Sequence, residues 1–180
     1  MIRPSFDVHK LDLPGVLLLQ PKRWDDERGF FMETFHEEAL AAAGVQHRFV
    51  QDNLSFSKKA VLRGLHFQKE PHAQAKLVRC VSGEIFDVAA DHNPNSPTFG
   101  KYVSATLSGE KQNMLYIPAE YAHGFCVLSD EAIVEYKVSD YYHPESAFGV
   151  RYDEAIFTIP WPVHLPILSE QDKLWPGISL

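Results

Sequence analysis

Residues 61–80 read VLRGLHFQKEPHAQAKLVRC and place Arg63, His66 and Lys76 within runs of apolar residues. An imidazole changes its charge close to neutral pH, so it can take and return a proton, while lysine and arginine supply positive charge. Strands bury aliphatic side chains readily and charged side chains only reluctantly. The three residues therefore lie either on a solvated face or in a pocket whose chemistry uses a base and positive charge.

Most of the chain consists of short alternating or apolar segments separated by Gly, Pro, Asn and Ser, a pattern typical of β-strands. Short strands are therefore expected to position these residues. We predict strands at 16–20, 30–35, 48–53, 61–67, 75–81, 84–91, 101–107, 114–117, 124–128 and 132–139. One helix is predicted at about 37–43, before a capping Gly44, and a shorter one after Ser169. This pattern predicts an all-β antiparallel sandwich or barrel, such as a jelly roll, in one domain over residues 1–180. Phe30 and Phe31 are expected in its core.

Charge and composition narrow the class of protein. The formal net charge of −7 argues against nucleic acid or an anionic membrane as a partner, because both attract a basic face. The longest apolar run, at 16–19, is too short to span a bilayer, and no basic-then-apolar leader opens the chain. Cys80 and Cys126 lie in apolar runs without a framework of spaced cysteines, so we expect buried free thiols. These features predict a cytoplasmic protein.

The opening segment resembles the first metal-binding motif of the cupin-type jelly roll, with substitutions. That motif has a Gly, a His-x-His pair, a Glu, and a second Gly seven residues after the Glu. Here Gly64 precedes His66, and Gln68 stands in place of the second His. Lys76, which lies seven residues before Gly83, stands in place of the Glu.

The second cupin motif, a Pro followed by a His and an apolar strand, is present as Pro118 and then His123-Gly124-Phe125. A protonated lysine donates hydrogen bonds and repels a divalent cation, so two histidines with Lys76 make a poor metal site. The substitutions predict a barrel mouth used for acid–base chemistry, with no metal and no other cofactor. On spacing alone, the alternative is that His66 and His123 only form hydrogen bonds beneath loops.

Segments along nearly the whole chain, in order, resemble the dTDP-4-dehydrorhamnose 3,5-epimerase family of deoxysugar biosynthesis. They are DERGFFME at 26–33, FVQDN at 49–53, VLRGLHFQ at 61–68, AQAKLVR at 73–79, SPTFG at 96–100, IP at 117–118, AHGF at 122–125, EYK at 135–137, and LS at 168–169 with Asp172. The resemblance implies a cupin-type fold and a nucleotide-linked 4-keto-6-deoxyhexose as the substrate.

The resemblance also implies roles that agree with what the residues can do. The 4-ketone acidifies the hydrogens on C3 and C5, so inversion needs a base on one face, an acid on the other, and positive charge near the ketone oxygen. The matching positions are His66 as the base, Asp172 as the carboxylate that orients it, Tyr136 as the acid and Lys76 beside the ketone oxygen. A carboxylate on one imidazole nitrogen fixes the tautomer that the base requires.

Further positions match substrate-binding residues of the family. Arginine forks suit diphosphate oxygens, amides suit hydroxyls and base edges, and a tyrosine ring can stack on thymine. These positions are Arg28, Glu33, Gln51, Asn53, Arg63, His123 and Tyr141, with Tyr142 as the alternative stacking residue. Without the resemblance, residues 26–28 could be only a solvated turn.

The chain departs from the family pattern at three places, of which the first and the last are expected at the nucleotide end of the pocket. Ala147 stands where family members usually have Glu or Asp. Family members also usually have a Trp near the position of Tyr152, and Gln171 stands before Asp172 where Lys is common. The nucleotide and the sugar are therefore predicted less firmly than the proton chemistry. A relative that epimerises C3 alone would share the same His, Lys and Tyr.

Two other classes of protein make different predictions from an epimerase. A metal-dependent cupin oxygenase would contain iron or manganese, and Gln68 and Lys76 argue against it. A non-catalytic module that binds sugar nucleotides would not need a base and a phenol on opposite faces. The resemblance further implies a homodimer in which N-terminal strands add to the neighbour's sheet.

Overall fold

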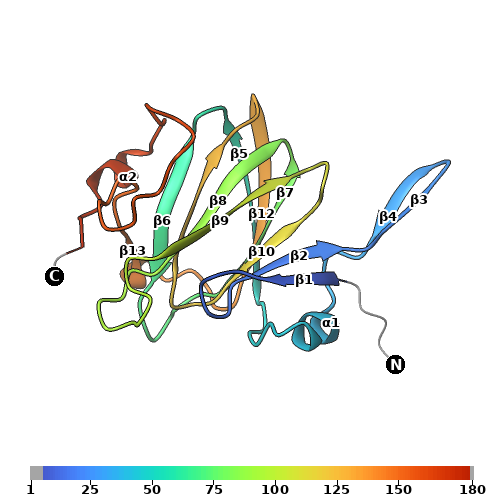
Figure 1. Ribbon diagram of the computed structural model, residues 1–180, viewed down its shortest axis with the longest axis horizontal. Helices are drawn as coiled ribbons and strands as arrows, with labels where there is room; N and C mark the ends of the chain where they lie inside the picture. Colours follow the sequence, from blue (N-terminus) through green and yellow to red (C-terminus); the bar gives the residue numbers. More distant parts are fainter. Residues whose placement is uncertain (1–5, 179–180) are drawn as a thin grey trace.

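The computed structural model describes residues 6–178, and these form two antiparallel sheets and a projecting hairpin (Figure 1). The six-stranded sheet runs in the order β1 (Phe6–Lys10), β2 (Leu17–Pro21), β10 (Met114–Ile117), β7 (Lys76–Ser82), β12 (Glu131–Val138) and β5 (Gln51–Lys58). The five-stranded sheet runs in the order β13 (Ala147–Gly149), β6 (Leu62–Gln68), β11 (Ala122–Val127), β8 (Glu84–Ala90) and β9 (Tyr102–Ser108). The predicted jelly roll is confirmed, as two hydrogen-bonded sheets that do not close into one barrel.

The main core lies between the two sheets. Val78 and Val134 of the six-stranded sheet pack with Ile85 and Leu107 of the five-stranded sheet, and all four are fully buried. Strand β11 is buried along its whole length because it lies inside its sheet, between β6 and β8. Apolar side chains from both sheets thus exclude water and fix the spacing of the strands that carry the polar site residues.

Short elements close the ends of the sandwich. Helix α1 (Glu37–Ala42) begins after His36, whose side chain accepts a hydrogen bond from the Ala39 amide, and Gly44 follows it with φ 103°. Helix α2 (Glu170–Leu174) begins after Ser169, and a 3₁₀ turn, η1 (Pro144–Ser146), precedes β13. Both predicted helices are confirmed. Within residues 6–178, no helix has the length and apolar character needed to cross a membrane.

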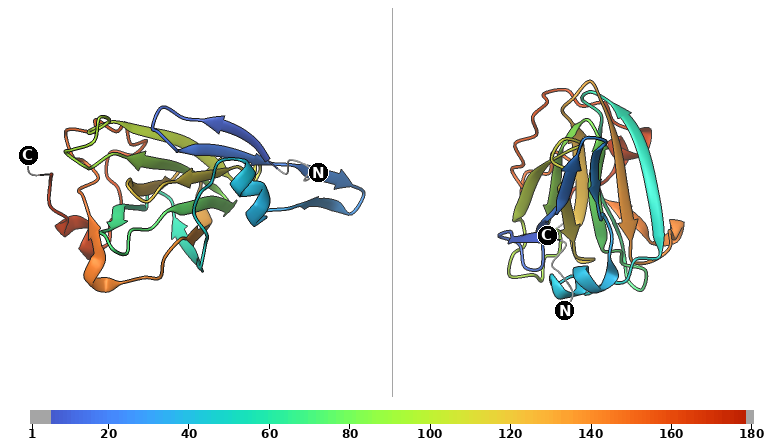
Figure 2. Two further views of the ribbon diagram at one scale, coloured as in Figure 1. Left: turned by 90° about the horizontal axis from the view of Figure 1, so that it is seen from below. Right: turned by 90° about the vertical axis from the view of Figure 1, so that its right-hand side faces the viewer.

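Hairpin strands β3 (Arg23–Asp26) and β4 (Gly29–Met32) project from the sheets, at the end of the molecule opposite α2 (Figures 1 and 2). The prediction that Phe30 and Phe31 lie in the core is wrong, because their hairpin extends beyond both sheets and leaves the rings 49% and 70% exposed. Trp24 beside them is 53% exposed. The hairpin therefore presents an apolar surface to its surroundings.

Strand boundaries also differ from the prediction, and the strand predicted at 30–35 corresponds to β4, which ends at Met32. The strand predicted at 48–53 begins at Gln51 and continues to Lys58, where it pairs with β12 over its whole length. Strands β1, β3 and β13 were not predicted. Most residues of β1 and β3 are polar and exposed, and β13 has only three residues, so pairing with a partner strand holds them extended. Cys80 and Cys126 are buried free thiols as predicted, and burial raises the pKa of each to about 11.

Candidate active site

A cavity of about 320 Å³ is lined by residues of both sheets. The five-stranded sheet supplies His66 and Arg63 from β6 and His123 from β11, while the six-stranded sheet supplies Lys76 from β7 and Tyr136 from β12. Gln51 and Asn53, from β5, also line it. The structure therefore brings most of the predicted site residues to one cavity, with the predicted base and the predicted acid on different sheets.

Asp172 reaches His66 from helix α2. The Ser169 side chain accepts a hydrogen bond of 3.0 Å from the Asp172 amide, which fixes the first turn of the helix and aims the carboxylate. His66 Nε2 lies 2.5 Å from Asp172 Oδ1, and the Asp172 side chain is only 4% exposed. Burial raises the pKa of this carboxyl, but hydrogen bonds from His66, Ser169 and Trp175 outweigh burial and hold the pKa below its usual value.

Two glycines allow the strands that carry the histidines to approach each other. Gly64 has φ 131°, and a Cβ atom there would lie 2.5 Å from the Gly124 Cα atom. Another residue at position 64 would therefore be strained and would push β6 away from β11. Because the strands pair closely, His66 and His123 are direct cross-strand partners.

Asp87 and His123 form a second, fully enclosed pair. His123 Nε2 lies 2.7 Å from Asp87 Oδ1, and their side chains are 8% and 0% exposed. Burial lowers the pKa of His123 and outweighs the opposing effect of the Asp87 charge. The other oxygen, Asp87 Oδ2, is buried with no hydrogen-bond partner among the described residues. Sequence reasoning missed Asp87, because it lies in an apolar strand without a motif of its own.

Lys76 is the buried cation of the site. Its Nζ donates a hydrogen bond of 3.1 Å to the main-chain carbonyl of His66, and the residue is 7% exposed. Burial lowers the pKa of Lys76 from 10.5 to about 8, although the nearby Asp87 charge acts in the opposite direction. Lys76 is thus still mainly protonated at pH 7 and close to its titration range.

Tyr136 contributes its phenol from the opposite sheet. It pairs across the strands with Asn53 on β5 and with Val78 on β7. Burial raises the pKa of Tyr136, and the positive charge of Arg63 opposes that shift. A phenol that keeps its proton at neutral pH is suited to donate it.

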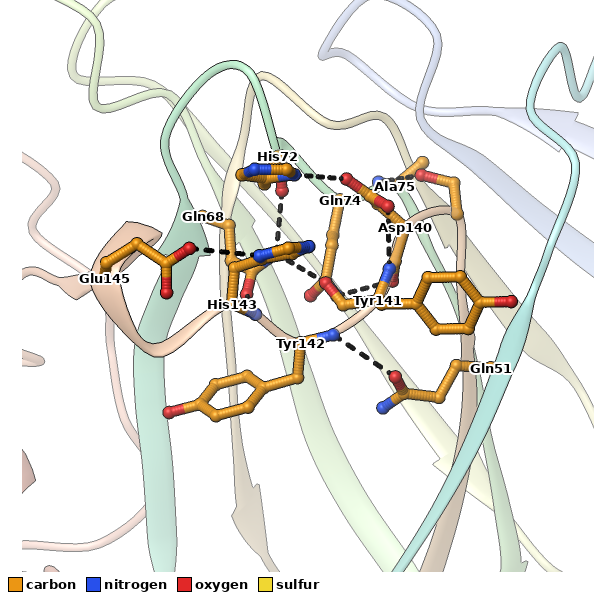
Figure 3. Close-up of polar contacts among 11 residues, drawn as sticks. Gln51, Gln68, His72, Gln74, Ala75, Asp140, Tyr141, Tyr142, His143 and Glu145 are labelled. Carbon is orange, nitrogen blue, oxygen red and sulfur yellow. Dashed lines mark hydrogen bonds and ion pairs between the residues drawn. The ribbon is translucent and has the colours of Figure 1, made fainter.

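Gln68, where a cupin would have its second histidine, holds segment 139–145 by hydrogen bonds (Figure 3). Its Nε2 donates to the carbonyls of His72 and Tyr141, at 2.7 and 3.1 Å, and its Oε1 accepts from the His143 amide at 2.7 Å. The Tyr142 amide donates to Gln51 Oε1 at 3.2 Å, so Tyr142 is held where it lines the cavity. Gln68 thus has a positioning role that the motif comparison did not reveal.

A second histidine cluster joins the 69–74 turn to the same segment (Figure 3). His72 bonds Asp140 at 3.0 Å, His143 bonds Glu145 at 3.1 Å, and atoms of His72, His143 and Glu145 lie close enough to suggest a metal site. However, the two rings stack with centroids 3.5 Å apart and planes within 12°. Their in-plane lone pairs therefore run side by side and do not converge on one ion. The cluster instead ties the 69–74 turn to segment 139–145.

Three predicted binding residues lie away from the cavity of this chain. Arg28 is in the exposed turn of the β3–β4 hairpin, where it pairs with Asp26, and Glu33 follows that hairpin. Tyr141 and Tyr142 are each 60% exposed, but their rings point in different directions, and Tyr142 is the one that lines the cavity (Figure 3). Ala147 and Gln171, which depart from the family pattern, do line it.

The fold and the site together define a cupin-type jelly roll whose cavity is equipped for acid–base chemistry. Residues 10–179 match the family model described as dTDP-4-dehydrorhamnose 3,5-epimerase, and the chain belongs to this family.

Relatives with known names support the assignment to this family. A protein of Shigella flexneri named dTDP-4-dehydrorhamnose 3,5-epimerase is 52% identical over 167 residues, which cover 92% of each chain. The crystal structure of dTDP-6-deoxy-D-glucose-3,5-epimerase from Legionella pneumophila, in complex with dTDP-4-keto-L-rhamnose, is 43% identical, with a TM-score of 0.91 over 96% of this chain and 93% of that one. A Streptomyces niveus protein named dTDP-4-dehydrorhamnose 3-epimerase is 38% identical and is matched over 91% of this chain and 79% of that one.

Proposed function

We propose that this chain epimerises C3 and C5 of dTDP-4-dehydro-6-deoxy-glucose, giving dTDP-4-dehydrorhamnose, by proton transfer through an enolate. One observation carries the proposal: a carboxylate-backed imidazole on one sheet and a phenol on the other line the same cavity, together with a buried ammonium group. The kinship with named 3,5-epimerases supports the choice of substrate.

His66 is the base in this mechanism. Its Nε2 donates a hydrogen bond to Asp172, which leaves the lone pair on Nδ1 to take the proton from the sugar carbon. Asp172 then stabilises the imidazolium that forms. Because the His66 side chain is 41% exposed, a sugar in the cavity can reach it.

Lys76 and Tyr136 complete the reaction. The Lys76 ammonium uses one hydrogen on the His66 carbonyl and has others for the ketone oxygen, whose negative charge it stabilises while the enolate exists. Tyr136 returns a proton from the other sheet, so the carbon leaves with inverted configuration. Because a lysine occupies the position of the cupin carboxylate ligand, the proposed chemistry uses no metal.

Arg63, Gln51, Asn53, His123 and Tyr142 or Tyr141 would bind the sugar and the nucleotide. Arg63 is held by a 3.0 Å bond from its Nε to Ser57, which leaves further guanidinium donors for phosphate oxygens. This chain has Ala147 in the cavity wall where relatives usually have Glu or Asp, so its wall lacks that negative charge. The nucleotide end of the pocket is therefore where this chain is expected to differ from its relatives.

A homodimer would bring Arg28 and Glu33 into use. Their hairpin exposes Trp24, Phe30 and Phe31 and extends beyond both sheets, so it could reach a neighbouring copy. Sedimentation analysis should give the mass of two chains, and Phe31→Glu should shift the protein toward monomers with weaker nucleotide binding. A wild-type monomer would contradict this part of the proposal. The two buried free thiols support a cytoplasmic setting, which cell fractionation would test.

Incubation with dTDP-4-dehydro-6-deoxy-glucose in deuterated water tests the reaction. Deuterium at both C3 and C5 is the expected result, while deuterium at C3 alone would favour the single-carbon epimerase to which the 38% identical relative points. Binding without exchange would mean a sugar-nucleotide binding module. Loss of activity on chelation, together with stoichiometric iron or manganese, would mean a metal-dependent cupin.

A further inference from the structure

The residue after helix α2, Trp175, shares the carboxylate oxygen that orients the predicted base. Trp175 Nε1 lies 3.2 Å from Asp172 Oδ1, and the same oxygen lies 2.5 Å from His66 Nε2. One acceptor atom thus receives two ring N–H groups. The indole also meets the His66 ring edge-on, with centroids 6.1 Å apart and planes at 68°.

Gly149 provides the space for this indole. It lies on β13 directly across from His66, and a Cβ atom there would come within 2.5 Å of indole Cε2 and 2.6 Å of Nε1. Such distances are far below an ordinary van der Waals contact, so only glycine lets the ring lie at this place. Trp175 also lines the cavity, so its ring forms part of the cavity wall beside His66.

We propose that Trp175 is a positioning residue for the proton transfer. Its indole N–H holds the Asp172 carboxylate in place and partly neutralises its charge, and the absence of a side chain at Gly149 leaves room for the ring. This inference rests on the proposed function, in which His66 is the base. Two donors restrict the rotation of the carboxylate, so the imidazole keeps its tautomer and direction.

Removal of the indole N–H has a defined electrostatic consequence. More of the Asp172 negative charge then acts on His66 and stabilises its protonated form, which cannot serve as a base. The other titratable or charged groups that line the cavity with His66 are Arg63 on its own strand, His123 on β11, Lys76 on β7, Tyr136 on β12 and Tyr142 on segment 139–145. None of these changes in the variants below, so the shift can be attributed to Trp175.

The experiment compares Trp175→Phe with Trp161→Phe. Trp161 is a matched control, because its Nε1 also donates to one acceptor, the Tyr152 carbonyl at 2.8 Å, and its ring also packs edge-on, against Phe86. Trp175→Phe should lower kcat for deuterium exchange about tenfold with KM within about twofold, since a hydrogen bond to a charged group is lost. The acid limb of its kcat/KM profile should move up by roughly half a pH unit. Trp161→Phe should change neither quantity, although its thermal stability should fall.

Gly149→Ala provides a second variant, because its methyl group should displace the indole while the indole itself is kept. It should reproduce the loss of kcat and the shift of the acid limb. If Trp175→Phe and Gly149→Ala both fold and keep wild-type kcat and pH profile, the inference is overturned. A loss of stability alone, as in Trp161→Phe, would likewise overturn it.

The pH titration of the His66 ring by NMR, on the protein without substrate, separates this inference from the proposed function. Its midpoint should move to higher pH in Trp175→Phe. A moved midpoint in a protein whose wild type exchanges no sugar hydrogen would refute the epimerase and keep the Trp175 contact. An unmoved midpoint in an active enzyme would refute the inference and keep the epimerase.

Discussion

Replacement of Lys76 by Met should make the protein more stable at neutral pH while abolishing its activity. The pKa of Lys76 is lowered from 10.5 to about 8 by burial, and a displacement of roughly 2.5 units corresponds to about 3 kcal/mol of unfavourable free energy for the charged form. Methionine removes this charge and has a similar length. It also loses the hydrogen bond to the His66 carbonyl, which costs about 1 kcal/mol. The net gain at pH 7 is therefore about 2 kcal/mol.

The difference should depend on pH in a defined direction. Folded wild-type protein releases the Lys76 proton near pH 8 and the unfolded chain near 10.5, so the unfolded chain binds more protons between these values. The stability of the wild type consequently rises through this window relative to the variant. Above pH 10.5 the charge penalty is gone, and Lys76→Met should be less stable than wild type by about 1 kcal/mol, the value of the lost hydrogen bond.

Urea denaturation of both proteins at equal concentration, from pH 7 upward, measures this difference. Equal concentration matters because a dimer's stability depends on it. Lys101→Met is a matched control, since Lys101 is exposed and its removal should leave stability nearly unchanged at every pH. A Lys76→Met protein that is less stable than wild type at pH 7, or a difference that does not vary with pH, would refute the assignment of Lys76 as a buried cation kept for function.

Further predictions concern the rate of exchange and its products. His66→Ala should abolish exchange at C3 and leave nucleotide binding measurable by calorimetry; normal turnover would remove His66 from the role of base. Tyr136→Phe should retain some exchange but alter the product stereochemistry seen by NMR, and an unchanged product ratio would exclude Tyr136 as the acid. The kcat/KM profile should fall as pH rises through about 8, where Lys76 loses its proton, and Lys76→Arg should lose this basic limb if it remains active. Asp87→Asn should move the same limb to lower pH, because the Asp87 charge favours the protonated lysine, and a limb that stays in place would mean that Lys76 does not produce it.

The fold could be predicted because the strands that build it alternate in a regular way and are separated by turn residues. Strands such as β8, β9 and β10 lie within a residue or two of their predicted positions, since their side chains face one shared core. The hairpin could not be predicted in the same way. Phe30 and Phe31 have the composition of core residues, and nothing local indicates that their strands leave the sheets.

Sequence alone can place a residue in the candidate site when the residue belongs to a motif. It cannot do so when the residue contributes through a contact with a partner far along the chain. His66, Lys76 and His123 have recognisable spacings, whereas Asp87 and Trp175 become meaningful only through partners far along the chain. Gln68 illustrates the limit. Its place in the motif argues against a metal site, but its bonds to segment 139–145 could not be predicted, because they depend on where the sheets place that segment.

Two histidines on neighbouring strands, His66 and His123, each pair with an aspartate in the site. The different exposure of the two imidazoles suits them to different roles. His66 is 41% exposed and His123 only 8%, so a sugar can reach the first imidazole far more readily than the second. Burial lowers the pKa of His123, which keeps it neutral beside the Lys76 cation and avoids a second positive charge. A neutral His123 anchored to Asp87 can offer its free nitrogen to a sugar hydroxyl without competing for the proton that His66 removes. In the proposed mechanism, the two motif histidines would therefore divide into one base and one binding group, because helix α2 covers the Asp172 carboxylate and the core encloses that of Asp87.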